Sequence, residues 1–367
     1  MNYQNIPTTY TAQTREQLQE RIAQRKRELG SQLVILGHHY QSDDVIAFAD
    51  FVGDSLKLSQ QAASLKDVRY IVFCGVHFMA ESANILSPAA TVLLPHPAAG
   101  CAMADLADDT DVATAIDDLA ADTAARVVPI TYVNSTAAVK AATARAGGAC
   151  CTSSNVRNVF AWALAPTGQG GAAADKILAI PDQNLGINTA VAMGFTPDDC
   201  VVYDPRLAHG GLTADQIRTA RFILWKGHCY VHQRFTPEHI HAARQQRPSV
   251  RVMVHPECPR ETVALADAAG STEQIIRAVA ESPDVRDWAI GTESNLVNRL
   301  AARHRDKRIR TLGDAPALCV QMARIDLPRL LWTLDTLATG QPNNTVRVPE
   351  NIAADARLAL ERMIAIT

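Results

Sequence analysis

The sequence predicts an α/β protein built from three similar units, each containing a parallel β-sheet. Two observations lead to this prediction. Short apolar or β-rich runs alternate along the chain with helix-compatible stretches, which is the pattern of βαβ units with parallel strands. Three passages of the chain also share one order of short motifs, and such repetition indicates repeated supersecondary units.

Each of the three passages has the same plan. A β-rich run ends in polar residues, a turn rich in small hydroxyl residues follows, and the passage closes at a cysteine. The runs are LVILGHHYQ, VVPITYVN and VRVMVHPEC, the turns are Gly53-Asp54-Ser55, Cys151-Thr152-Ser153-Ser154 and Gly270-Ser271-Thr272, and the cysteines are Cys101, Cys229 and Cys319. His38 and Cys101 lie 63 positions apart and His255 and Cys319 lie 64 apart, whereas Tyr132 and Cys229 lie 97 apart. The middle unit is therefore expected to carry an insertion.

The individual elements follow in order. Residues 14–29 read as an amphipathic helix that ends at Gly30. Ten β-rich or apolar runs come next, at 33–37, 69–75, 91–95, 127–133, 176–182, 200–204, 221–225, 251–255, 287–292 and 308–313. The acidic, alanine-rich segment 107–124 and residues 235–237 are expected to connect the units, and 350–366 to form a terminal helix.

The composition excludes several classes of protein. The chain has 367 residues, of which 47% are hydrophobic and 20% charged, and this is typical of a globular protein with a sizeable core. A net charge of −3 and the absence of basic runs argue against nucleic acid as a partner. No apolar stretch approaches the roughly 18 residues needed to cross a bilayer, and the first residues do not resemble a secretory signal. We expect no membrane association and a cytoplasmic location.

The cysteines indicate a metal centre. Cysteines two to four residues apart are usual at structural zinc sites, and the chain has no CxxC pair. Three isolated cysteines at the ends of three units suit an iron–sulfur cluster in which one iron lacks a protein ligand and can act as a Lewis acid. Cys74, Cys150 and Cys200 lie in or beside apolar runs and are expected to be small buried residues. The roles of Cys151 and Cys258 stay open.

The edges of the predicted sheets indicate where a ligand would bind. In parallel α/β sheets, ligands gather beyond the carboxyl ends of the strands, where helix N-termini offer unpaired N–H groups to anions. Three such edges facing one another would form a single pocket for an anionic ligand.

The motifs, taken in order, resemble the quinolinate synthase family (quinolinate synthetase A) over nearly the whole chain. The matching strings are GHHYQ, DFVGDSLKLS, FCGVHFMAE, AGCAMAD, TYVNSTAAVKA, CTSSN, IPDQNLGINTA, WKGHCYVH, VHPECP, AGSTEQII and GTESNL. The resemblance implies three αβα domains in pseudo-threefold arrangement around a central active site. It also implies an iron–sulfur-dependent transferase that condenses iminoaspartate with dihydroxyacetone phosphate to quinolinate, releasing phosphate and water, in de novo NAD biosynthesis.

The resemblance further implies a cofactor, partners and domain boundaries. A [4Fe-4S] cluster would be held by Cys101, Cys229 and Cys319. Besides the two substrates, the enzyme that supplies iminoaspartate and the cluster-assembly proteins are candidate partners. The expected domains are residues 1–120 with the N-terminal helix, an enlarged unit at 121–234, a third unit at 235–340, and the C-terminal helix at 341–367.

The reaction consists largely of proton movements, which points to acid/base side chains. Tyr40 and Glu257 are suited to this work, with His38 and His255 beside them, and one positioned group contributes about 10²–10⁴-fold. The alternative for Glu257 is a solvated loop carboxylate. For His232, orientation of a substrate carboxylate or of the cluster environment competes with packing.

Hydroxyl and amide side chains are candidates for binding the carboxylates and phosphate of the substrates. Singly, each hydroxyl in a turn could be a helix N-cap, whereas recurrence in all three units favours an anion cradle. Asn134 lies two residues from Tyr132 and therefore on the same face of an extended strand. The expected substrate-binding residues are His38, Ser55, Tyr132, Asn134, Ser153, His255, Glu257, Ser271 and Thr272.

Two other functions compete with this reading. A different three-cysteine iron–sulfur enzyme could dehydrate or reductively dehydroxylate a phosphorylated substrate, although the TYVN, CTSSN and VHPEC motifs argue against it. An iron–sulfur carrier or oxygen sensor would need only a labile cluster, and it would not need the tyrosine, glutamate and hydroxyl turns.

Overall fold

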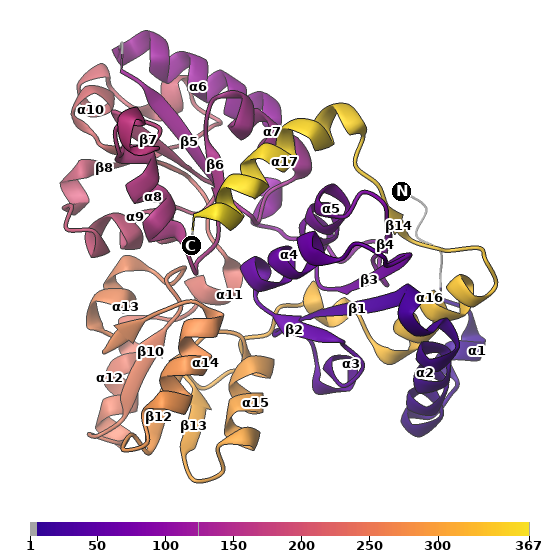
Figure 1. Ribbon diagram of the computed structural model, residues 1–367. Helices are drawn as coiled ribbons and strands as arrows, with labels where there is room; N and C mark the ends of the chain where they lie inside the picture. Colours follow the sequence, from indigo (N-terminus) through magenta and orange to yellow (C-terminus); the bar gives the residue numbers. More distant parts are fainter. Residues whose placement is uncertain (1–5, 124, 367) are drawn as a thin grey trace. The chain divides into compact units, whose positions relative to one another are not determined.

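The computed structural model describes residues 6–123 and 125–366, and its strands form three separate sheets (Figure 1). All neighbouring strands in the described residues pair in parallel, apart from the antiparallel pair of β14 (Thr345–Val346) with β4 (Thr91–Leu93). The predicted α/β class with parallel sheets is confirmed. The chain divides into two compact units, Met1–Cys101 with Leu318–Pro349 (unit 1) and Ala102–Ala317 with Glu350–Thr367 (unit 2).

Unit 1 contains one sheet, in the order β14-β4-β3-β1-β2. Its remaining strands are β1 (Leu33–His38), β2 (Phe51–Gly53) and β3 (Tyr70–Cys74). Its helices are α1 (Thr8–Thr11), α2 (Arg15–Leu29), α3 (Asp43–Ile46), α4 (Ser55–Ser64), α5 (His77–Leu86) and α16 (Leu327–Ala338), with short 3-10 turns at Gly30–Gln32 and Met322–Arg324.

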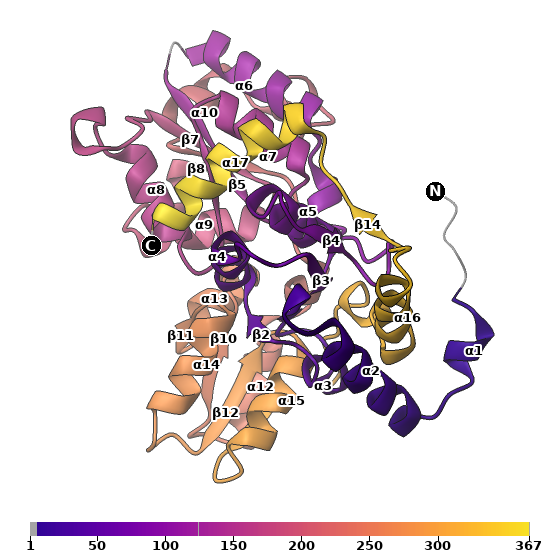
Figure 2. The same cartoon turned by 45° about the vertical axis from the view of Figure 1, so that its right-hand side comes forward.

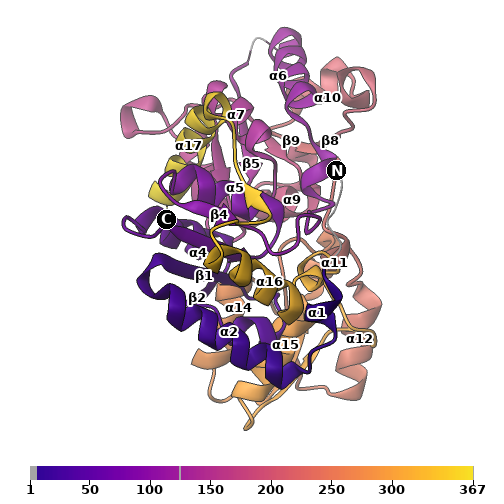
Figure 3. The same cartoon turned by 90° about the vertical axis from the view of Figure 1, so that its right-hand side faces the viewer.

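The helix predicted near the N-terminus is α2, and it packs side by side with α16 (Figure 3). The Thr14 side chain caps its first turn in a reciprocal pair with Gln17, and Gly30 ends it with a φ of 53°, which glycine adopts without strain. Arg21 and Arg25 donate hydrogen bonds to the mostly buried Asp335 of α16, at 2.7 and 2.6 Å. These contacts fix α2 against α16.

Unit 2 contains two sheets. The larger has the order β6-β5-β7-β9-β8 and consists of β5 (Val127–Tyr132), β6 (Ala149–Cys151), β7 (Lys176–Ile180), β8 (Cys200–Tyr203) and β9 (Phe222–Trp225). The smaller has the order β11-β10-β12-β13 and consists of β10 (Arg251–Val254), β11 (Ala268–Ala269), β12 (Asp287–Gly291) and β13 (Arg308–Thr311). The α-helices of this unit are α6 (Asp109–Thr123), α7 (Ala137–Arg145), α8 (Val156–Leu164), α9 (Gln183–Ala192), α10 (Ala214–Thr219), α11 (Tyr230–Gln233), α12 (Pro237–Gln246), α13 (Arg260–Leu265), α14 (Thr272–Glu281), α15 (Ser294–Arg303) and α17 (Glu350–Ala365). Four 3-10 turns accompany them, at Ala104–Leu106, Thr167–Gln169, Pro197–Asp199 and Ala208–Gly211.

The three sheets share one strand order, which confirms the repeat read from the sequence. With β8 and β14 set aside, each sheet has four strands, which counted along the chain lie in the order fourth, third, first, second, as β4-β3-β1-β2, β9-β7-β5-β6 and β13-β12-β10-β11. The insertion expected in the middle unit includes β8 and α10. β8 is an extra edge strand beside β9 in the sheet, and α10 directly precedes β9 in the chain.

The acidic segment expected to be a connector is instead a helix. α6 packs against α7 and α10, and its residues Val112, Ala115 and Leu119 belong to a buried cluster with Ile217 and Trp225. The prediction of a connector was wrong because three buried positions, spaced three and four residues apart, suffice to anchor an amphipathic helix whose other faces are acidic.

The predicted terminal helix is confirmed as α17, which belongs to unit 2. It lies along α7 in two views (Figures 1 and 2) and packs against both α7 and β6. Its buried residues are Ala353, Ala356, Ala359, Leu360 and Met363, so a stripe of small side chains faces the unit. Among all described helices, none has both the length and the apolar character required to span a bilayer.

Candidate active site

The first strands of the three sheets end in the polar residues expected from the sequence. His38 is the last residue of β1, Tyr132 is the last residue of β5, and His255 directly follows β10. At these edges, His38 aligns with Gly53 and Tyr132 with Cys151, so the hydroxyl turns begin beside the same strand ends. The repeat therefore places the candidate residues at the carboxyl edges of parallel strands, where ligands of α/β proteins usually bind.

The same kind of local hydrogen bond occurs at two of these strand ends. In unit 1 the Tyr40 amide donates to His38 Nδ1 at 3.1 Å, and in unit 2 the Glu257 amide donates to His255 Nδ1 at 3.3 Å. A ring nitrogen that accepts an N–H bond carries no proton, so the hydrogen of each neutral imidazole lies on Nε2. Burial, helped by the charge of His232 and opposed by Glu257, lowers the pKa of His255 to about 3. His255 is therefore neutral near pH 7.

A buried chain of hydrogen bonds surrounds Glu257 in unit 2. The Tyr132 hydroxyl donates to Glu257 Oε1 at 2.5 Å, and His232 Nδ1 lies 2.7 Å from Glu257 Oε2. His232 Nε2 lies 3.0 Å from the Thr292 hydroxyl, and the ring of His255 stacks on that of His232 with centroids 4.2 Å apart. Glu257 is 3% exposed, which excludes a solvated loop carboxylate.

The pKa values of the Glu257 and Asp182 carboxyls are shifted in opposite directions. Burial acts to raise the pKa of Glu257, but the neighbouring imidazoles of His255 and His232 and the hydrogen bonds from His232 and Tyr132 outweigh it, so this pKa is lowered. The pKa of Asp182 is raised well above its usual value by burial and then by the charge of Glu257. The surroundings therefore favour the charged form of Glu257 and disfavour that of Asp182.

Helix α9 holds the loop that carries Glu257. The Asn184 side chain donates to the backbone carbonyl of Glu257 at 3.2 Å. Asn188 donates to the carbonyls of Pro256 and Cys258, both at 2.8 Å. Asn184 and Asn188 are four residues apart and thus lie on one helix face. Their amides fix the loop, and with it the direction of the Glu257 side chain.

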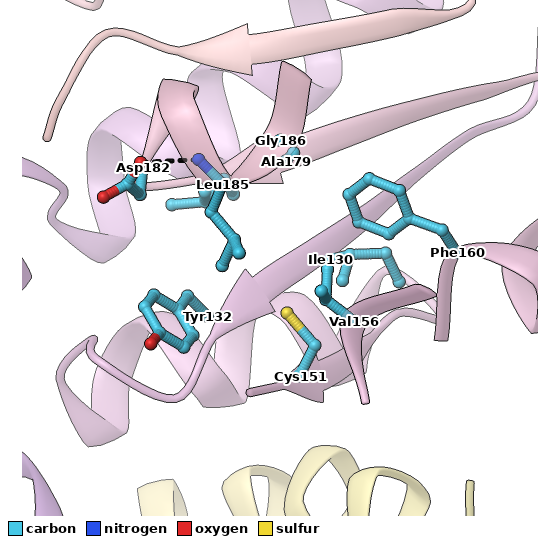
Figure 4. A pocket seen from close by; sticks show the side chains of 10 residues that line it. Ile130, Tyr132, Cys151, Val156, Phe160, Ala179, Asp182, Leu185 and Gly186 are labelled. Carbon is cyan, nitrogen blue, oxygen red and sulfur yellow. Dashed lines mark hydrogen bonds between the residues drawn. The ribbon is translucent and has the colours of Figure 1, made fainter. Parts of the chain in front are cut away.

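Asp182 links the start of α9 to Cys229. Its Oδ1 accepts a bond from the Leu185 amide at 2.8 Å, marked in Figure 4, and its Oδ2 accepts one from the Cys229 amide at 3.2 Å. Asp182 also lines a cavity of about 10 Å³ together with Tyr132 and Cys151. This volume is close to that needed for one water molecule and is too small for a substrate.

Cys229, His232 and Glu257 form the one group of three potential metal-binding side chains found in the described residues. Their ligand atoms lie within 4.8 Å of one another. Both oxygens of Glu257 already accept hydrogen bonds, from Tyr132 and from His232. These bonds favour a carboxylate that orients neighbouring groups over one that binds a metal.

The cysteines differ in burial and in their place in the fold. Cys101, Cys229 and Cys319 are partly exposed and lie in the loops that follow β4, β9 and β13. Cys74 and Cys150 are buried as predicted, but the prediction for Cys200 was wrong, because this first residue of β8 is also partly exposed. Burial raises the pKa values of Cys74 and Cys150 to about 12, that of Cys200 to about 11 with help from Asp199, and those of Cys151 and Cys258 well above the usual range. The fully buried Cys258 lies with its sulfur 3.6 Å from the Gly291 carbonyl oxygen. The raised pKa values disfavour the thiolate form that binds metals at these five positions.

The hydroxyl turns follow the second strand of each sheet and lead into α4, α8 and α14. Ser271 is the N-cap of α14, in a reciprocal capping pair with Gln274, so its hydroxyl has a structural role. Ser55 and Thr272 are the first residues of their helices, and the N-cap of α4 is Asp54. Ser153 is partly exposed in the turn before α8. Three of the four predicted hydroxyl residues are thus not N-caps.

One further contact and one unpaired oxygen concern the anion-binding residues predicted in unit 2. The Ser154 hydroxyl donates to the Ser271 hydroxyl at 2.8 Å, which joins the turn after β6 to the turn after β11. Asn134 lies just beyond β5, and its buried side-chain oxygen has no hydrogen-bond partner. A donor from a ligand would satisfy this oxygen.

Sequence reasoning missed Asp182, Asn184, Asn188, Ser154 and Thr292. Thr292 directly follows β12 and Asp182 lies two residues beyond β7, and such polar residues at the ends of apolar runs were the available signal. Ser154 was overlooked beside Ser153 in the same turn.

Comparison with known proteins gives the family. A model of the family "Quinolinate synthetase A protein" matches residues 20–365. Proteins named quinolinate synthase from Nocardioides sp. and Streptomyces coelicolor are each 51% identical, over 95% and 93% of this chain and 89% and 86% of their own length. The quinolinate synthase of Bacillus subtilis is 46% identical over 99% of this chain and 96% of its own length. The chain belongs to the quinolinate synthetase A family.

Proposed function

We propose that this protein is a quinolinate synthase. It condenses iminoaspartate with dihydroxyacetone phosphate to quinolinate and releases phosphate and water, a step of de novo NAD biosynthesis. Family membership and the relatives of about half identity over nearly the whole chain support the reaction. The single structural observation that carries the proposal is the buried chain of Tyr132, Glu257, His232 and Thr292, with neutral His255 stacked beside it.

The residues of this chain would move and hold protons. Ionised Glu257 accepts hydrogen bonds from Tyr132 and His232. It can take a proton from a substrate that displaces either partner. Neutral His255, with its hydrogen on Nε2, can donate a hydrogen bond to a carbonyl or leaving oxygen. The water-poor surroundings strengthen each of these hydrogen bonds.

In unit 1 the proposed acid/base pair is His38 and Tyr40. Their rings meet edge to face with centroids 4.6 Å apart, and the Tyr40 amide holds the His38 imidazole with its hydrogen on Nε2. At the end of β10 the Glu257 amide donates to His255 Nδ1 in the same way, which supports equivalent use of both strand ends. We assign Tyr40 to proton transfer at the phosphorylated substrate and His38 to its orientation.

Cys101, Cys229 and Cys319 are proposed to hold the [4Fe-4S] cluster. They fit this group because they are partly exposed and occupy equivalent loops, whereas Cys74, Cys150, Cys151 and Cys258 are buried and Cys200 lies in β8. When bound, the cluster supplies a Lewis-acidic iron for a substrate hydroxyl or carboxylate. Asp182 supports one ligand position through its hydrogen bond to the Cys229 amide.

The negative groups of the substrates are proposed to bind Ser55, Ser153, Thr272 and Asn134, with Tyr132 beside them. Hydroxyl groups and amides at helix starts favour anions. Ser271 is proposed to contribute through its bond to Ser154, since its own hydroxyl caps α14. A pseudo-threefold arrangement of the domains, with the boundaries predicted from the sequence, remains part of the proposal.

The cytoplasm is the proposed compartment, because thiolate ligands stay reduced there. The supplier of iminoaspartate and the proteins that assemble clusters are the proposed partners. The test is anaerobic reconstitution with iron and sulfide, followed by a quinolinate assay with both substrates. We expect product only when the cluster and both substrates are present, and product without reconstitution would refute the iron–sulfur assignment.

A further inference from the structure

Helix α17 ends against the turn that carries Ser153, and one side chain joins them. Asn155 is buried and directly precedes α8. Its side-chain oxygen accepts bonds from the Thr152 amide at 2.9 Å and from the Thr152 hydroxyl at 3.1 Å. Its side-chain nitrogen donates to the carbonyls of Met363 and Ile366, at 2.9 and 2.8 Å. Asn155 thus uses both ends of its amide.

We propose that the C-terminal helix positions the turn formed by Thr152, Ser153, Ser154 and Asn155 for substrate binding, with Asn155 as the positioning residue. The last carbonyls of a helix lack partners within the helix and need donors from elsewhere. Asn155 supplies these donors and transmits the position of α17 to Thr152. The inference rests on the proposed function, because Ser153 is there assigned to substrate binding.

Two further observations support this role. α17 packs along α7 and β6, so its last turn is fixed in unit 2 by more than the Asn155 contact. On the other side, the Ser154 hydroxyl donates to Ser271 at the start of α14. The turn is therefore held from two directions, by the end of α17 and by the N-cap of α14, and Ser153 lies between the residues that make these contacts.

Asn155→Asp tests the donor half of the amide, because it keeps the acceptor and removes the donor. Aspartate keeps an oxygen that can accept from Thr152, but it replaces the donor with a negatively charged oxygen facing two carbonyls at the negative end of a helix. Asp355→Asn is the matched control, because it removes an exposed ion pair between Arg145 and the same helix, 3.0 Å long, without touching the turn. A chain ending at Ile364 is a second variant that removes the Ile366 carbonyl and keeps the buried Met363.

The experiment measures amide hydrogen exchange and steady-state kinetics on reconstituted protein. For Asn155→Asp we expect exchange of the amides in the turn and in the last turn of α17 to rise about tenfold or more. The KM of at least one substrate should rise by roughly tenfold, kcat should change much less, and the visible absorption of the cluster should be unchanged. The chain ending at Ile364 should show a smaller change in the same direction, and Asp355→Asn should match the wild type.

Unchanged exchange in the turn for both Asn155→Asp and the shortened chain would overturn the proposal. Faster exchange with an unchanged KM for both substrates would also overturn it, since α17 would then only pack against the turn. The exchange measurement needs no turnover. A wild-type protein that makes no quinolinate would therefore refute the proposed function. The exchange data would still show whether α17 positions the turn.

Discussion

The Tyr132 hydroxyl donates a 2.5 Å hydrogen bond to Glu257, which joins the carboxyl end of β5 to the loop after β10. The two residues are 125 positions apart, and both are almost completely buried. The second oxygen of Glu257 is bound by His232. A carboxylate held at both oxygens has a fixed direction, which is the property required of a proton acceptor in a condensation and dehydration sequence.

Glu257→Gln tests whether this carboxylate transfers protons or binds metal. Glutamine has nearly the same shape but cannot accept a proton at neutral pH, so we expect normal cluster absorption and a quinolinate rate lower by about 10²–10⁴-fold. Absorption spectra and product assays on the same reconstituted sample give both answers. Near-normal turnover would remove Glu257 from the mechanism, and loss of the cluster would make it a metal ligand or a folding residue.

Alanine variants of the cysteines test the cluster ligands. Replacing Cys101, Cys229 or Cys319 should abolish the near-ultraviolet and visible absorption after anaerobic reconstitution. Cys258→Ala is the matched control, because its buried thiol keeps its proton and should not be required for absorption. A cluster lost in Cys258→Ala and kept in Cys229→Ala would contradict the ligand assignment.

The residues of the hydroxyl turns have two different roles, substrate binding and helix capping. Ser153→Ala and Thr272→Ala should weaken use of the substrates by about 1.5–3 kcal/mol, the usual value of a hydrogen bond to a charged group, and leave the cluster spectrum intact. Ser271→Ala removes an N-cap and should lower the free energy of unfolding by about 1 kcal/mol. Kinetic constants and denaturant midpoints distinguish the two effects. Wild-type kinetics in both Ser153→Ala and Thr272→Ala would reduce these residues to structural roles.

The stability of the apoprotein should depend on the charge of His255. Its folded pKa of about 3 lies below the unfolded value of about 6.5. The unfolded chain therefore takes up a proton that the folded protein refuses. The contribution of His255 is fully present above about pH 6.5 and is lost as the pH falls towards 3, by up to about 1.4 kcal/mol per pH unit.

Denaturant unfolding between pH 7 and 4 measures this dependence. His255→Asn removes the group and should flatten the fall in the free energy of unfolding, whereas the exposed His241→Asn should keep the wild-type slope. Equal slopes in wild type and His255→Asn would show that His255 is not held neutral by burial.

The repeated architecture could be predicted because it depends on local patterns. All ten β-rich runs contain a strand, and the shared motifs lie at matching strand ends. The strands that were missed, β2, β6, β11 and β14, have only two or three residues and therefore show no alternation or apolar run. The acidic face of α6 obscured its three buried positions.

The candidate site was predictable in its residue types but not in its contacts. Glu257 and His255 stood out because they are polar residues in a motif at the end of an apolar run. That Tyr132, His232 and Thr292 complete a buried chain around Glu257 depends on pairings over 25 to 125 positions, which no local pattern specifies. The two roles of the Asn155 amide likewise depend on the end of α17, more than 200 positions away.

The most direct test of the proposed reaction follows the atoms of both substrates. Reconstituted wild-type protein is given iminoaspartate that carries ¹⁵N and dihydroxyacetone phosphate that carries ¹³C at every carbon, under anaerobic conditions, and the product is analysed by mass spectrometry. We expect quinolinate that contains the nitrogen label and all three labelled carbons, with one phosphate released for each quinolinate. Quinolinate lacking either label, or no quinolinate from protein with a complete cluster spectrum, would contradict the proposed reaction.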